Sequence, residues 1–158
     1  MQERVLIPLD GSKVGEAALP FIEKLIDMLS PETKLEVTLF GVITLLRHWV
    51  VVGEASAPIS YTEEELSLIK QRVIDYLEKT GEILRSKGAI VNTKVSTGNA
   101  ADEILKAAEE IKADMIAMST HGRSGLRRLA FGSVTDKVLQ GASMPVVAVR
   151  APEGTVNV

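Results

Sequence analysis

Short apolar runs alternate with amphipathic stretches along most of this chain, and this alternation limits its fold more than any other feature. The apolar runs are Arg4–Leu9, Leu35–Ile43, Ala89–Val95, Asp114–Ser119 and Pro145–Val149. Apolar residues at helical spacing fill Val14–Leu29, Thr62–Ser86, Ala100–Ile111 and Ser133–Gln140. Strands that alternate with helices form parallel sheets covered on both faces. The pattern therefore predicts an α/β fold, an open parallel five-stranded sheet with helices on both faces. It does not choose among the strand orders that right-handed crossovers allow.

Local signals mark three ends of two of the predicted helices. Thr62 and Glu65 have the spacing of a capping box, which satisfies free amides at a helix start. Asn99 is placed to cap the next helix. Gly88 follows the long helix, where a residue that tolerates positive φ is typical.

One segment does not follow the alternation. Residues 44–61 contain Trp49, Gly53 and Pro58 without a clear period, so we expect an irregular insertion: a loop, a short hairpin or an interface element. Residues 151–158 are expected to be a frayed tail. Because no linker or repeat divides the rest, the sequence predicts a single domain over residues 1–158.

Composition excludes several classes of protein. The chain has 158 residues and no cysteine, which excludes a disulfide framework and thiolate metal ligands. Two histidines, His48 and His121, are too few for a three-histidine zinc site. A net charge of −3 and a pI near 5.5 argue against a general nucleic-acid binder. The first residues do not resemble a secretory signal, and no apolar stretch approaches the ~18 residues of a membrane span. We therefore expect a soluble, cytoplasmic protein without a membrane partner.

The stretch Met115–Thr135 carries the clearest chemical signal. It contains no Asp or Glu but holds one histidine, three arginines and three glycines, which are His121, Arg123, Arg127, Arg128, Gly122, Gly125 and Gly132. Glycines allow positive φ and close approach of the backbone to a ligand. Ser133, after the last glycine, opens a helix whose free amides and dipole favour an anion. The stretch predicts an anion site, although a solvated basic loop with turning glycines remains the alternative.

A carboxylate follows the first predicted strand. Ligands of open parallel sheets bind beyond the carboxyl ends of the strands, where the strand order reverses. If the first and fourth strands are neighbours, Asp10 meets Ser119–His121 at that place and offers an acceptor for ribose hydroxyls. Asp10-Gly11-Ser12 is also a good turn by itself, and both interpretations stay open.

Two motifs resemble those of a known family. Val5–Ser12 (VLIPLDGS) is similar to the first strand of the universal stress proteins, and Ser119–Val134 is similar to their nucleotide-binding segment. The family motif is Gly, two residues, Gly, nine residues, then Gly followed by Ser or Thr. This chain has Gly122, nine residues and Gly132-Ser133, with Ser119 in place of the first glycine. Ser119 would either crowd a ligand or add a hydrogen bond.

The resemblance, to the ATP-binding branch of the family, implies a sheet in the order 3-2-1-4-5, of the Rossmann-like, adenine nucleotide alpha hydrolase-like kind. It also implies a bound adenine nucleotide, ATP or else AMP or ADP, with Mg²⁺ travelling on the phosphates. Asp10 would lie near the ribose or base, Val42 near the adenine edge, and the Gly132 segment at the β- and γ-phosphates. The residues implied as contacts are Pro8, Asp10, Val42, Met118, Ser119, Thr120, His121, Gly122, Arg123, Gly125, Gly132, Ser133, Val134 and Thr135.

The implied function is a nucleotide-dependent switch in a stress response, with two alternatives. A slow ATP hydrolase is one, although no catalytic or metal-ligating residue stands out. Leu126 breaks a G-x-S-x-G pattern, and no G-x-x-x-x-G-K-[ST] occurs. The other is a nucleotide-independent dimeric interaction module. The last predicted strand, Pro145–Val149, would be an uncharged sheet edge, so we expect a homodimer through it. Val147→Pro is expected to delete an amide from that edge.

Overall fold

The computed structural model describes residues 2–45, 48–52, 55–121 and 131–155, with the backbone alone for the described residues between 46 and 59. Its strands are β1 (Gln2–Pro8), β2 (Lys34–Ile43), β3 (His48–Val52), β4 (Ala55–Ile59), β5 (Ile90–Thr97), β6 (Met115–Ser119) and β7 (Val146–Val149). Its α-helices are α1 (Leu19–Met28), α2 (Glu63–Ser86), α3 (Ala100–Glu110) and α4 (Ser133–Gly141), and a 3-10 turn covers Gly15–Ala18. None of the helices in this described part has the length and hydrophobicity to cross a bilayer.

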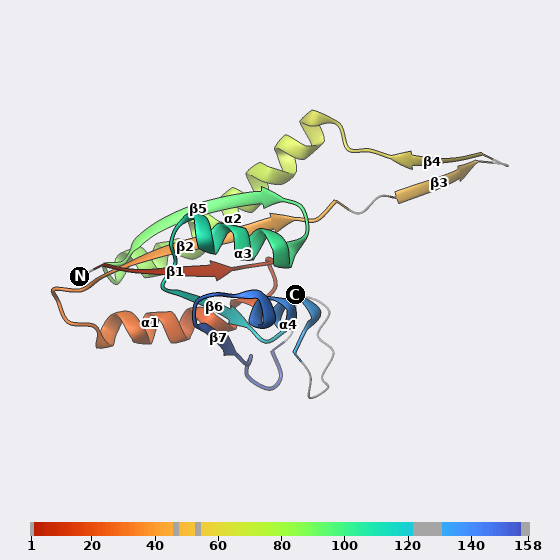
Figure 1. Ribbon diagram of the computed structural model, residues 1–158. Helices are drawn as coiled ribbons and strands as arrows, with labels where there is room; N and C mark the ends of the chain where they lie inside the picture. Colours follow the sequence, from red (N-terminus) through yellow and green to blue (C-terminus); the bar gives the residue numbers. More distant parts are fainter. Residues whose placement is uncertain (1, 46–47, 53–54, 122–130, 156–158) are drawn as a thin grey trace.

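Five strands form one parallel sheet in the order β5-β2-β1-β6-β7 (Figure 1). When the strands of this sheet alone are numbered along the chain, leaving out β3 and β4, the order is 3-2-1-4-5. The predicted fold and strand order are therefore confirmed. The order reverses between β1 and β6, which pair through Val5 with Met115 and Leu6 with Ile116. The carboxyl ends of β1 and β6 therefore lie next to each other.

Two apolar layers cover the sheet. On one face, Ile22 of α1 and Leu77 and Leu84 of α2 belong to a cluster with Ile7 and Leu39 of the strands. On the other face, Ala101, Ala107 and Ala108 of α3 and Val138 of α4 belong to a cluster with Leu6, Phe40 and Ile116. The chain crosses the sheet in one direction through α1 and α2 and in the other through α3 and α4, so right-handed crossovers place the two pairs on opposite faces.

Helix α2 starts and ends where the sequence indicated. Thr62 Oγ1 accepts from the Glu65 amide at 3.1 Å, and the Glu65 carboxylate accepts from the Thr62 amide at 2.8 Å. Gly88, beyond its end, has φ +94°. The helix approaches β2 closely at Gly41, where a Cβ would lie only 2.5 Å from Cγ1 of Val73.

The segment expected to be irregular, 44–61, contains a hairpin. Strands β3 and β4 pair antiparallel, with Val52 opposite Ala55 and Trp49 opposite Pro58. Figure 1 shows the hairpin extending away from the five-stranded sheet, between the end of β2 and the start of α2. The short hairpin, one of the three possibilities that the sequence left open, is therefore present, and a role of the segment as an interface element stays a prediction. The described part of the tail holds a turn, in which the Thr155 hydroxyl donates to the Pro152 carbonyl at 2.7 Å.

Candidate functional site

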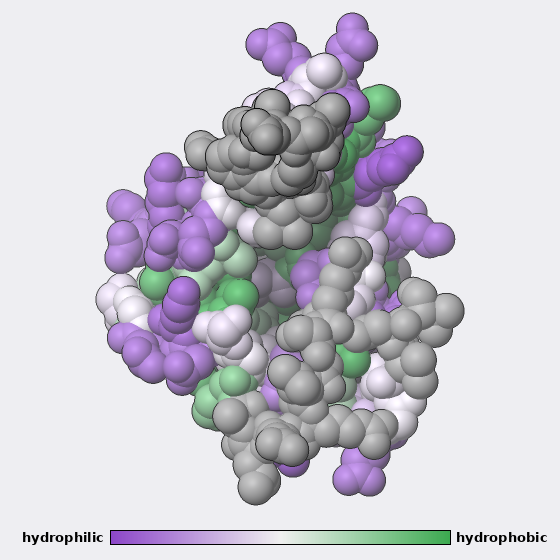
Figure 2. Space-filling model, turned by 90° about the vertical axis from the view of Figure 1, so that its right-hand side faces the viewer, coloured by the Kyte–Doolittle hydropathy of each residue, from purple (hydrophilic) through white to green (hydrophobic). Residues whose placement is uncertain are grey.

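A cavity of about 340 Å³ opens at the carboxyl ends of β1, β2 and β6, and we call it the carboxyl-end cavity. Its walls come from these strand ends, from the first turns of α3 and α4, and from the turn after β1. The lining residues are Pro8, Leu9, Asp10, Gly15, Phe40, Val42, Thr44, Ala100, Ile104, Met118, Ser119, His121, Gly132, Ser133, Val134 and Thr135. Figure 2 looks onto this side of the molecule, where green apolar residues lie between purple polar ones.

The floor of the carboxyl-end cavity is apolar. Phe40 of β2 is fully buried, and Ile104 of α3 and Met118 of β6 are 3% and 5% exposed. Val42 and Ala100, both half-buried, continue this surface toward the opening. A flat apolar group such as a nucleobase would lose its contact with water on this floor, which favours its binding.

Asp10 is held at the mouth of the cavity by the turn that follows β1. Its Oδ1 accepts from the Ser12 amide at 2.9 Å and from the Ser12 hydroxyl at 2.5 Å. The same hydroxyl accepts from the Gly15 amide at 2.9 Å. A Cβ at residue 15 would lie 2.3 Å from Asp10 Oδ1, so this approach depends on glycine. Asp10 therefore makes the turn and also lines the cavity, and its role as an acceptor for ribose hydroxyls stays a prediction.

The phenol of Tyr76 lies behind this turn. It reaches across from α2 and donates to Glu16 Oε1 at 3.0 Å. Burial raises the pKa of Tyr76 well above its usual value, and the hydrogen bond to Glu16 and its charge add to the rise. The phenol therefore stays protonated and ties α2 to the turn that carries Asp10.

The end of β6 connects the cavity to α4. Thr120 is 6% exposed, donates its amide to the Val149 carbonyl at 2.9 Å and accepts from the Gly132 amide at 2.8 Å. Its hydroxyl lies 3.0 Å from Nδ1 of His121. The Ser119 hydroxyl accepts from the His121 amide at 3.3 Å. Ser119, in the position of the first motif glycine, therefore stabilises the turn after β6 as well as lining the cavity.

The N-terminus of α4 supplies donors to the same space. Its N-cap is Gly132, which has no side chain to accept from the first amides of the helix. Geometry leaves the amides of the first turn without intrahelical partners, so those of Ser133 and Val134 are suited to an anion. The Thr135 hydroxyl is engaged, because it donates to the Ser119 carbonyl at 2.9 Å.

One physical reason given for the Gly132 signal is wrong. Gly132 has φ −60° and ψ 155°, values open to any residue, so this position does not need the positive φ that glycine permits. A Cβ here would lie 3.4 Å from the Thr120 carbonyl oxygen and 3.6 Å from Cα of His121, which are ordinary van der Waals contacts. The described surroundings therefore do not require glycine at this position.

The structure brings ten of the fourteen predicted contact residues together around the cavity. Thr120 lies behind the wall rather than in it, and Gly122, Arg123 and Gly125 lie outside the described residues. Sequence reasoning missed six lining residues: Leu9, Gly15, Phe40, Thr44, Ala100 and Ile104. The apolar ones occupy core positions of a strand or helix, so nothing in the pattern separates them from ordinary core. Within the described part of the chain, no three acidic or histidine side chains cluster as a metal site would require.

The strand order and the position of the cavity define a Rossmann-like α/β protein, with a ligand space where the strand order reverses. Residues 1–150 match the sequence model of the universal stress protein family, so the chain belongs to that family. It is 31% identical over 154 residues to universal stress protein MJ0531 of Methanocaldococcus jannaschii, an alignment that covers 97% of this chain and 85% of the relative.

Two solved structures show the shared fold. Protein MJ0577 of the same archaeon superposes with a TM-score of 0.74 at 23% identity, covering 96% of this chain and 98% of its own. A universal stress protein family member from Arabidopsis thaliana, solved with AMP bound, has a TM-score of 0.63 at 16% identity and 99% coverage of both chains. The resemblance to the universal stress protein family is confirmed by the match to the family model, and these structures confirm the fold.

Proposed function

We propose that this chain binds an adenine nucleotide in the carboxyl-end cavity and uses it as a signal in a stress response. The observation that carries the proposal is the pairing of an apolar floor with two polar ends. The floor is built on Phe40, Ile104 and Met118, the Asp10 carboxylate lies at the mouth, and the uncapped N-terminus of α4 closes the other side. The AMP found in the Arabidopsis relative supports this choice of ligand.

The described residues divide the work of binding. The floor would take the adenine, and backbone groups at Val42 would meet its edge. Asp10, oriented by Ser12, would accept from the ribose hydroxyls, and the amides of Ser133 and Val134 would donate to phosphate oxygens. Mg²⁺ binds through phosphates with one or two carboxylates. Asp10 is the only carboxylate among the described lining residues, so the ion would be held chiefly by the nucleotide.

Calorimetry on the full chain tests the proposal, with ATP, ADP and AMP titrated in the presence and absence of Mg²⁺. Ala100→Leu, which fills the floor from the start of α3, is expected to abolish the heat of binding and leave the melting temperature unchanged. Ala151→Leu, at a half-exposed alanine outside the cavity, is the matched control. Absence of heat with all three nucleotides would overturn the assignment.

We also propose a homodimer formed through the outer edge of β7. This strand pairs with β6 on one side and is last in the sheet order, and its residues are uncharged and half-buried. The amides of Ile116 and Thr120 donate to the carbonyls of Pro145 and Val149. Because the N–H and C=O of one strand residue point to the same side, alternate residues face β6, and Val147 is one of them.

The outward amides are those of Val146 and Ala148, so the expectation that Val147→Pro deletes an edge amide is wrong. Ala148→Pro is the correct edge variant, since proline is tolerated where the amide faces outward. Light scattering should give a dimeric mass for the wild type and a monomeric mass for Ala148→Pro, with the same circular dichroism spectrum for both chains. A monomeric wild type at micromolar concentration would contradict the proposal.

A further inference from the structure

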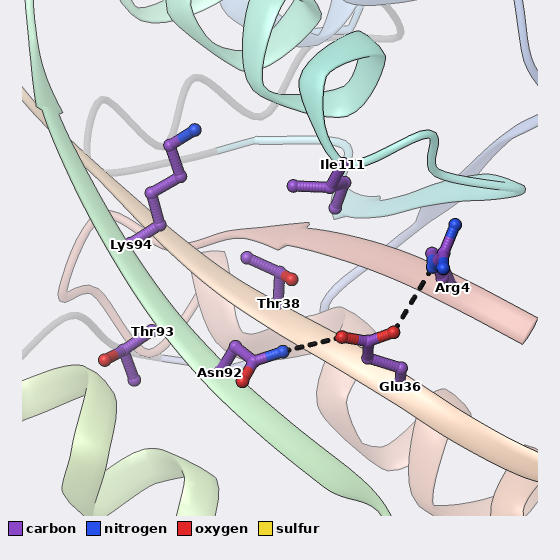
Figure 3. A pocket seen from close by; sticks show the side chains of 7 residues that line it. All are labelled: Arg4, Glu36, Thr38, Asn92, Thr93, Lys94 and Ile111. Atoms are coloured by element: carbon purple, nitrogen blue, oxygen red, sulfur yellow. Dashed lines mark hydrogen bonds and ion pairs between the residues drawn. The ribbon is translucent and has the colours of Figure 1, made fainter.

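A second cavity, of about 210 Å³, lies on the same face of the sheet near the amino ends of the strands (Figure 3). We call it the amino-end cavity. Its lining residues are Arg4, Glu36, Thr38, Asn92, Thr93, Lys94 and Ile111. Parallel strands covered by helices are usually apolar on both faces, so a polar group at this place in β2 and β5 is unexpected for a purely structural surface.

Thr38 lies at the centre of this cavity, between Asn92 and Lys94 on one side and Arg4 on the other (Figure 3). It is 6% exposed, and its hydroxyl has no hydrogen-bond partner among the described residues. Every fully buried side-chain nitrogen or oxygen of the described part has a hydrogen-bond partner. Since the Thr38 oxygen has none within that part, it is not fully buried and must face the cavity. A hydroxyl that faces a cavity without a protein partner keeps its donor and acceptor capacity for a water or a ligand that enters the cavity.

The groups around Thr38 offer more donors than acceptors. The Glu36 carboxylate already accepts from Gln2 Nε2 at 2.7 Å, Asn92 Nδ2 at 2.9 Å and Arg4 Nε at 3.3 Å. The terminal nitrogens of Arg4 have no partner among the described residues. Lys94 pairs with Glu110 and keeps further N–H groups. Glu36 therefore orients its neighbours, and the remaining capacity is for a ligand that accepts hydrogen bonds.

We propose that the amino-end cavity binds a small organic carboxylate. The planar fork of Arg4 matches the two oxygens of a carboxylate, and the Thr38 hydroxyl adds a donor from the floor. Ile111, at the end of α3, supplies an apolar contact for a short carbon chain. Lys94, whose charge is balanced by Glu110, adds a further N–H donor on the opposite side. This site is separate from the carboxyl-end cavity. Phe40 is the next residue after Thr38 on the same face of β2, and it lines only the carboxyl-end cavity, whereas Thr38 lines only the amino-end cavity.

The test uses ¹⁵N-labelled full-length protein titrated with propionate at constant ionic strength. Propionamide, which has the same shape without the charge, is the matched ligand control, and inorganic phosphate distinguishes a carboxylate site from a general anion site. We expect saturable shifts of the Thr38, Asn92 and Lys94 amides with propionate, at an affinity on the order of 1 mM. Absent shifts, or equal effects of propionamide or phosphate, would overturn the proposal.

Thr38→Val separates a ligand site from a structural threonine. The variant removes the unpartnered hydroxyl at nearly constant volume, so we expect roughly a 5- to 10-fold loss of propionate affinity with no loss of stability. Thr80→Val is the matched control, because the Thr80 hydroxyl, on α2 and outside the amino-end cavity, donates to the Tyr76 carbonyl at 2.8 Å. That variant should lose stability and keep propionate affinity. If Thr38→Val is destabilised as much as the control, the hydroxyl is structural and the proposal is wrong.

Discussion

Ser133→Pro isolates the contribution of a single backbone amide to phosphate binding. Ser133 is the first residue of α4, where the amide has no intrahelical partner and proline is well tolerated. The preceding Gly132, at φ −60° and ψ 155°, already has the extended conformation that a residue before proline prefers. The substitution therefore removes one donor from the carboxyl-end cavity and leaves the helix intact.

The expected size of the effect follows from the charge of the acceptor. A hydrogen bond to a charged group contributes about 1.5–3 kcal/mol, which corresponds to a loss of roughly 10- to 150-fold in affinity for ATP. The free energy of unfolding should change by less than about 0.5 kcal/mol, since no internal hydrogen bond is lost. Ser133→Ala keeps the amide and loses only the hydroxyl, so it controls for the side chain.

Calorimetry with ATP and competition with adenosine give the readout. The proline variant should bind adenosine like the wild type, because adenosine has no phosphate to meet α4. Two results would refute the reasoning. One is equal ATP affinity of the proline and alanine variants, and the other is a loss of adenosine affinity as large as the loss for ATP.

Two further predictions concern α2. Gly41→Ala should lower the free energy of unfolding, measured by urea titration, by about 1–3 kcal/mol, because its Cβ would lie 2.5 Å from Val73 Cγ1. The double variant with Val73→Ala should be more stable by at least about 1 kcal/mol than the sum of the two single effects. The raised pKa of Tyr76 predicts that stability falls as pH rises above about 10, where the unfolded chain loses a phenol proton that the folded chain keeps. Tyr76→Phe should show a shallower fall between pH 8 and 11, and an equal slope would contradict the assignment.

The sequence predicted most of the sheet because local and long-range signals agree there. Buried parallel strands are short and apolar, and the caps at Thr62 and Asn99 sit at helix starts as their side chains require. The strand order could not be predicted from the same signals, since several orders satisfy the same alternation. It came from the family resemblance, and the pairing of β1 with β6 confirms it.

The hairpin in residues 44–61 could not be predicted with the same security. Trp49–Val52 is a continuous apolar run without alternation, and Pro58 argues against a strand. The register resolves this conflict. Trp49 lies opposite Pro58, and in an antiparallel ladder only alternate pairs exchange hydrogen bonds, so a proline fits at a position whose amide faces outward.

Thr38 and Thr135 show why the sites were harder to predict than the fold. Both are polar residues in predicted elements, and both are nearly fully buried, at 6% and 3% exposure. Sequence and burial do not distinguish them, but the hydrogen bonds do. The Thr135 hydroxyl donates to the Ser119 carbonyl and joins α4 to β6, whereas the Thr38 hydroxyl has no partner among the described residues.

The same substitution should therefore have opposite consequences at the two positions. Thr135→Val removes the hydrogen bond to the Ser119 carbonyl and leaves that buried carbonyl without this donor, so it should lower the free energy of unfolding by about 1–3 kcal/mol. Thr135→Ser keeps the hydroxyl and loses only a methyl group. Thr38→Val removes an unmade bond and should leave stability equal or higher. Urea titrations of the three variants decide between these outcomes. Equal losses at both positions would mean that burial, rather than the state of the hydrogen bond, sets the cost, and the distinction between a structural and a ligand-binding threonine would fail.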